Sequence, residues 1–107
     1  MNATNTTPLT YSLDCPRSGY VVTLVRDTTA THWWTASITL DLGGILDLSL
    51  NRCGDSPWQA CWRLHEAIGV VTDTLTALDP QEHRECIARL LRMWRDTLDL
   101  DLGHVRD

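Results

Sequence analysis

The sequence predicts an α+β fold: an antiparallel sheet of three or four strands, followed by a two-helix C-terminal hairpin packed on one face of the sheet. Between residues 20 and 50, apolar and polar side chains alternate at every second position, as in half-buried strands. Between residues 56 and 98, apolar positions recur at steps of three and four, which is typical of amphipathic helices. Because the strands precede both helices, we expect the helices on one side of the sheet. The 107 residues are predicted to form a single domain.

Four segments have the character of strands. Residues 1–19 are interpreted as a loose arm or, over Leu9–Asp14, as an edge strand. Tyr20–Arg26 is rich in valine, and Ile45–Leu50 supplies a partner for Trp33–Asp41. In Trp33–Asp41 one face is apolar and the other carries mostly hydroxyl groups. The residues expected to face the core from the last two strands are Trp34, Ala36, Ile38 and Leu40, and Leu46, Leu48 and Leu50.

Two further segments are predicted to be turns. Asp41–Gly44 ends in two glycines, which tolerate the positive φ of a tight hairpin. Asn51–Asp55 is expected to connect the sheet to the first helix. The hairpin register is well specified, because a shift by one residue would turn Asp47 into the core.

The first helix is predicted to begin after Ser56, whose hydroxyl can cap the first turn, with Pro57 at the first helical position. The helix has one continuous apolar side, made of Cys61, Leu64, Ile68, Val71, Leu75 and Leu78. On the same helix, Trp58, Trp62, His65 and Gly69 fall together beside that side. They are interpreted either as a contact with the second helix, with Gly69 allowing close approach, or as exposed tryptophan anchors for a partner.

A second helix start is predicted at Asp79, with Pro80 at the first position and Glu82 completing a capping box. We expect this helix to run to about Leu98 and, because it follows the first directly, to form an antiparallel hairpin. Its apolar side is predicted to contain Ile87, Leu90, Leu91, Trp94 and Leu98, and its polar side Glu85, Arg89, Arg92 and Asp96. Residues 99–103 are interpreted as a frayed helix end or a short added strand.

No metal or cofactor site is expected. Cys61 with His65, and His83 with Cys86, have the spacings of zinc ligands on helices. In an antiparallel hairpin, however, about fifteen helical residues separate the two pairs by roughly 20 Å. The four cysteines follow no disulfide pattern and are expected to be free thiols. The chain contains no nucleophile elbow, phosphate-binding loop or HExxH motif, so an enzyme is not expected.

The charge points to a partner of opposite sign. The formal net charge is −5, and all nine basic residues are arginine. This balance argues against direct binding to nucleic acid and permits a protein partner with a basic surface. On the outer sheet face, Val21, Val25, Trp33 and Ile45 are expected to be covered by the N-terminal arm, a second copy or a foreign partner. The residues predicted to bind a partner are Trp33, Trp58, Trp62, Asp41, Asp47 and Asp55, with Asp99, Asp101 and Asp107 in the tail as further acidic candidates.

Three hypotheses for function remain. The first is a small acidic, non-enzymatic binding protein that occupies a surface of another protein, such as an inhibitor of a nucleic-acid-handling complex of the phage counter-defence or anti-CRISPR type. The second is a homodimeric adaptor, chaperone or immunity protein, and the third is an enzyme without a recognisable motif. No apolar run reaches about 18 residues, so no membrane span is expected. The absence of an apolar signal sequence favours a cytoplasmic location.

Overall fold

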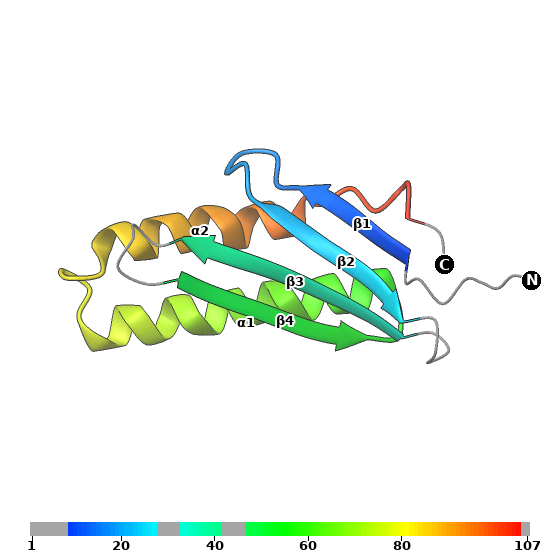
Figure 1. Cartoon of the computed structure of the whole chain (residues 1–107). Coiled ribbons are helices and arrows are strands. Elements are labelled where there is room, and N and C mark those ends of the chain that lie inside the picture. The colour runs from blue at the N-terminus through cyan, green and yellow to red at the C-terminus, as the bar shows by residue number, and fades with distance from the viewer. Residues whose placement is uncertain (1–8, 28–32, 42–46, 106–107) are drawn as a thin grey trace, which may run out of the picture.

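The computed structural model describes residues 9–27, 33–41 and 47–105. A four-stranded antiparallel sheet comes first in the chain, and two helices cover one of its faces (Figure 1). The elements are β1 (Leu9–Asp14), β2 (Val21–Asp27), β3 (Trp33–Asp41), β4 (Asp47–Gly54), α1 (Pro57–Leu78) and α2 (Arg84–Leu98). The strands lie in the order β1-β2-β3-β4, so β1 and β4 are the edges. The predicted fold class is confirmed, as is the edge strand at Leu9–Asp14.

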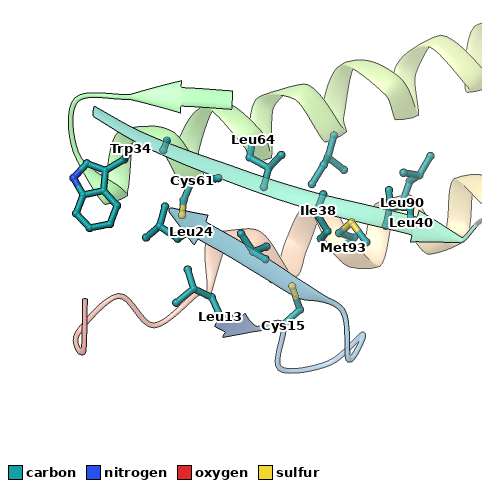
Figure 2. Close-up of a cluster of buried hydrophobic side chains, with 14 residues drawn as sticks. Leu13, Cys15, Leu24, Trp34, Ile38, Leu40, Cys61, Leu64, Leu90 and Met93 are labelled. Atoms are coloured by element: carbon teal, nitrogen blue, oxygen red, sulfur yellow. The ribbon is translucent and has the colours of Figure 1, made fainter. Parts of the chain in front are cut away.

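The apolar side of the sheet is the one predicted from the alternation. In β3 the side chains of Trp34, Ala36, Ile38 and Leu40 are buried, and in β4 Leu48 and Leu50 lie opposite Leu40 and Ile38. Leu90 and Met93 of α2 and several residues of α1 complete the core (Figure 2). The predicted hairpin turn after Asp41, with Ile45 and Leu46, lies outside the described residues.

The predicted turn at Asn51–Asp55 is wrong, because β4 continues to Gly54. The first half of the nine-residue β3 needs a partner for its backbone groups, and residues 51–54 supply it, ending with Trp34 opposite Gly54. A side chain at Gly54 would lie 2.6 Å from the backbone nitrogen of Ala60. Glycine at this position therefore lets the end of β4 meet the first turn of α1.

The predicted start of α1 is confirmed. The hydroxyl of Ser56 accepts a hydrogen bond from the backbone N–H of Gln59 at 3.1 Å, and Pro57 occupies the first turn. The predicted apolar side is buried over Cys61, Leu64 and Ile68, whereas Leu78 is 71% exposed. The helix therefore extends beyond the core at its C-terminal end.

The predicted start of α2 is wrong by several residues, since the helix begins at Arg84. The carboxylate of Asp79 does accept hydrogen bonds from the N–H groups of Gln81 and Glu82, both at 3.2 Å. These bonds stabilise a turn over residues 79–83 rather than the first turn of the helix. Two packed helices lie about 10 Å apart, so a direct junction would leave no chain to span that gap.

The predicted faces of α2 are partly wrong. Leu91 and Leu98 are 40% and 53% exposed, while Asp96, assigned to the polar side, is fully buried. The carboxylate of Asp96 accepts hydrogen bonds from the backbone N–H groups of Arg17 and Ser18, in the turn between β1 and β2. The buried face is therefore rotated towards that turn. Residues 99–103 form neither helix nor strand, and leucines of this segment pack against the core.

Candidate functional site

Four aromatic rings form a continuous row along the junction of the two helices. Trp58, Trp62 and His65 come from α1 and Trp94 from α2. The ring centroids of Trp58 and Trp62 are 5.7 Å apart and their planes differ by only 3°. His65 stacks between Trp62, at 5.2 Å, and Trp94, at 4.7 Å. We call these four residues the aromatic row.

His65 fixes the middle of the aromatic row. Its ring is buried, and Nδ1 lies 2.7 Å from the hydroxyl oxygen of Thr97. The hydroxyl of Thr97 donates to the carbonyl of Trp94 at 2.9 Å, so Nδ1 of His65 is the donor to Thr97. Burial lowers the pKa of His65 because the charged imidazolium is poorly solvated there. The neutral ring therefore acts as a structural link between the helices.

Gly69 allows the helices to approach closely beside the row. A side chain at Gly69 would lie 3.0 Å from the indole nitrogen of Trp94. The prediction that Gly69 and His65 contact the second helix is therefore confirmed. The other two residues of that predicted group, Trp58 and Trp62, are not covered by the second helix in the same way, because they are 62% and 40% exposed. The aromatic row thus begins in the core and ends at the surface.

A small apolar cavity of about 110 Å³ lies beside the exposed end of the row. Its walls include Trp58, Trp62, Cys61 and Thr97, and the C-terminal segment adds Leu98, Leu100 and Leu102. The cavity is large enough for part of one apolar side chain from another molecule. Because Leu100 and Leu102 share this cavity with Trp58 and Trp62, the segment after α2 lies beside the tryptophan pair.

Three exposed aspartates, Asp55, Asp99 and Asp101, lie in the segments next to the tryptophan pair. Asp55 is exposed and directly precedes the helix cap, and its backbone N–H donates to the side chain of Gln59 at 2.6 Å. Asp99 and Asp101 are exposed and alternate with the leucines of the cavity wall. Asp99 is 2.6 Å from the guanidinium of Arg17. We call Asp55, Trp58 and Trp62 the β4–α1 corner.

The other predicted partner-binding residues lie elsewhere. Trp33 begins β3 and is 40% exposed on the outer sheet face, at the end of the sheet where β4 runs into α1. Asp41 and Asp47 pair with each other at the opposite end of β3, about 26 Å from Trp33 at the usual rise per strand residue. Asp107 lies outside the described residues. The structure therefore brings together Asp55, Trp58 and Trp62, and separates them from the Asp41–Asp47 pair.

The described part of the outer sheet face is mostly polar. One row across all four strands consists of Ser12, Thr23, Ser37 and Asn51. Val21 pairs with Asp14 at one end of β2 and Trp33 with Asp27 at the other, roughly 20 Å apart. Over the described residues, these exposed apolar side chains do not join into one patch.

Within residues 9–27, 33–41 and 47–105, no group of three or more histidine, cysteine or acidic side chains lies close enough to hold a metal ion. All four cysteines are free thiols. Burial raises the pKa of Cys15 and of Cys61 to about 11, because the thiolate would be poorly solvated. Neither thiol is therefore activated as a nucleophile.

Sequence reasoning missed two features of this region. Trp94 was assigned to the apolar side of α2, but its stacking on His65 depends on the packing of two helices. The buried Asp96 was missed because its donors, Arg17 and Ser18, lie far from it in the sequence.

Comparisons of the chain with protein-family models, with curated proteins and with solved structures found no match. None of the helices, as far as the chain is described, has the length and apolar character to cross a membrane.

Proposed function

We propose that the protein is a non-enzymatic binding protein that occupies a surface of another protein with its β4–α1 corner. The observation that carries this proposal is Trp58, which is 62% exposed yet stacked flat on Trp62. An exposed indole already held by a neighbour loses little conformational freedom on binding, and tryptophan anchors dominate many interfaces. The apolar cavity beside the pair can receive part of one apolar side chain of the partner.

The partner is proposed to be a protein with a basic surface. Asp55 lies three residues before Trp58, Asp101 stands between two leucines of the cavity wall, and the chain carries a formal net charge of −5. Carboxylates around an apolar anchor attract and orient a basic surface before contact is made. Proteins that handle nucleic acid present such surfaces to phosphate groups. We therefore propose an inhibitor of a nucleic-acid-handling complex in the cytoplasm, of the counter-defence kind.

The cavities found among the described residues favour binding to a partner over catalysis. The cavity at the corner is lined mainly by apolar side chains, and within the described residues no set of titratable groups converges on it. An active site needs a few precisely placed polar groups in a concave pocket. This contrast favours a binding protein without enzymatic activity.

The test measures binding of the full chain to a partner captured from a lysate of the source cells. Trp58→Ala should raise the dissociation rate at least tenfold, and its effect on Tm should be small because the side chain is exposed. Asp55→Asn combined with Asp101→Asn should lower the association rate and flatten its salt dependence. Surface plasmon resonance at two salt concentrations separates the two effects.

Val21→Ala is the matched control, since it truncates an apolar side chain that is 43% exposed far from the corner. It should leave both rates unchanged. Trp33→Ala, measured in parallel, tells whether the contact extends onto the outer sheet face. Binding that responds to neither Trp58→Ala nor salt would refute the proposal.

A further inference from the structure

The outer face of the helix pair, away from the sheet, carries an uncovered apolar strip. A groove of about 340 Å³ runs between α1 and α2 there, with Gly69, Val70, Leu91 and Trp94 among its walls. Val70 is 64% exposed and Leu91 40% exposed. Leu98, two turns after Leu91 on the same side of α2, continues the strip. Among the described residues, all three side chains therefore keep a large part of their apolar surface exposed to water.

The two sides of the strip carry opposite charges. On α1, Glu66 and Asp73 line the groove. On α2, Arg95 lies between Leu91 and Leu98 on the exposed side, and Arg84 lies two turns before Leu91. Across the described stretches of the chain, none of these four charged groups forms an ion pair. One helix therefore presents free carboxylates, and the other free guanidinium groups.

We infer that this outer face binds a second copy of the chain across a two-fold axis parallel to the helices. Such an axis places α1 of each copy over α2 of the other. Glu66 of one copy then meets Arg95 of its partner, beside a shared apolar centre. The inference goes beyond the proposed function, and its surface is centred on Val70 and Leu91 and meets the β4–α1 corner only at Leu98.

The register within one chain fixes the register between copies. His65 is level with Thr97, and Gly69 is level with Trp94, so the two helices run in opposite directions. A two-fold axis along the helices keeps each residue at its own height. At a rise of about 1.5 Å per residue, Glu66 then lies within about 2 Å in height of the opposite Arg95. By the same rule, Val70 lies within about 2 Å in height of the opposite Leu91.

The charges argue against the other face-to-face arrangement. A two-fold axis across the helices would place α1 on α1 and α2 on α2. The carboxylates of Glu66 and Asp73 would then face carboxylates, and the arginines of α2 would face arginines. Such like-charge contacts disfavour that arrangement relative to the first.

The available area sets the expected strength. The fifteen residues of α2 give a shared length of about 22 Å, and two helices side by side are about 20 Å wide. The face thus offers roughly 450 Å² per copy, at the low end of specific interfaces. A weak, transient dimer with a dissociation constant in the micromolar range is therefore expected.

The arrangement has a consequence for binding. Because the axis runs along the helices, the β4–α1 corners of both copies lie at the same end of the dimer. The dimer would present two Trp58 side chains to a partner at one pole. A partner with two sites could then bind with higher avidity than one corner provides.

The test is sedimentation equilibrium of the full chain between about 5 and 500 µM, a range that brackets the expected constant. The mean mass should rise from the 12.1 kDa of one chain towards twice that value. Glu66→Arg alone and Arg95→Glu alone should each weaken the dimer at least tenfold, because each substitution occurs twice per dimer. The double variant Glu66→Arg with Arg95→Glu should restore it.

Asp14→Arg is the matched control: it reverses the charge of an exposed residue on β1, away from the helices, and should leave the dimer unchanged. Val70→Asp should abolish the dimer while the circular dichroism spectrum stays native. A mass of 12.1 kDa over the whole range would overturn the inference, as would a dimer whose single reversals have no effect. Either result leaves the proposed function standing, because partner binding is measured through Trp58.

Discussion

The buried carboxylate of Asp96 gives the sharpest test of how the helices are fastened to the sheet. Asp96 is fully buried and accepts hydrogen bonds from the backbone N–H groups of Ser18, at 2.6 Å, and Arg17, at 3.3 Å. The guanidinium of Arg17 adds a third contact at 3.2 Å. Replacing Asp96 by alanine removes all three and leaves two backbone donors without a protein partner.

The magnitude follows from these contacts. Hydrogen bonds to a charged group contribute about 1.5–3 kcal/mol each, and the contact with the exposed Arg17 side chain counts for little because water screens it. The loss for Asp96→Ala should therefore be about 3 kcal/mol of unfolding free energy. In a domain of this size that corresponds to a fall in Tm of roughly 15 °C.

Thermal denaturation followed by circular dichroism measures the change, with Asp99→Ala as the matched control. Asp99 contacts the same Arg17 side chain but is itself exposed, so its removal should barely change Tm. If Asp96→Ala were as stable as the parent protein, or if both variants lost the same amount, the role assigned to the buried carboxylate would be wrong.

The same carboxylate predicts a pH dependence. Burial alone would raise the pKa of Asp96, but the hydrogen bonds from Ser18 and Arg17 outweigh burial and lower it. The stabilising contribution of Asp96 is therefore complete above the unfolded-state pKa of about 3.9, and is lost as the pH falls through the lower folded-state pKa. The stability difference between the parent and Asp96→Asn should be constant from pH 8 to 5 and shrink below about pH 4.

Three further predictions concern the core. Ile38→Asp should unfold the domain and Thr39→Asp should be nearly silent in thermal melts, because only the first places a charge on the buried face of β3. Cys15 and Cys61, whose pKa burial raises to about 11, should be alkylated more slowly at pH 8 than the two half-buried cysteines, and equal rates by mass spectrometry would contradict this. Burial lowers the pKa of His65, so the contribution of His65 to stability should be lost as the pH falls below the unfolded-state pKa of about 6.5. In His65→Gln, Tm should therefore change less between pH 7 and pH 5 than in the parent protein.

The sequence predicts those parts of the fold that depend on local periodicity. The faces of β3 follow from alternation alone, because every second side chain of a strand points the same way. The start of α1 follows from Ser56 and Pro57, which act within one turn of the chain. The extension of β4 to Gly54 could not be predicted in this way, since residues 51–54 have turn-like composition and become a strand only because β3 lies beside them.

The candidate site shows the same division. The alignment of Trp58, Trp62 and His65 follows from helical spacing, and in the structure the three rings stack on one another. Which of them are exposed depends on how far α2 covers α1, which spacing does not reveal. Asp96 shows the limit most clearly: on helical periodicity it belongs with the polar side chains, but donors 79 and 78 residues earlier in the chain draw it into the interior.

These contacts hold α2 in place within the helix pair that carries both proposed binding surfaces. Asp96 and Trp94 are two residues apart and therefore lie on nearly opposite sides of α2. The carboxylate fastens one side to the turn between β1 and β2, and the indole packs against His65 and Gly69 of α1 on the other. Since α2 is held from both sides, the height of Arg95 relative to Glu66 is fixed before a second copy arrives. Asp96→Asn should therefore weaken the inferred dimer even at pH 7, where the fold persists, and sedimentation of that variant would show whether the two contacts are coupled.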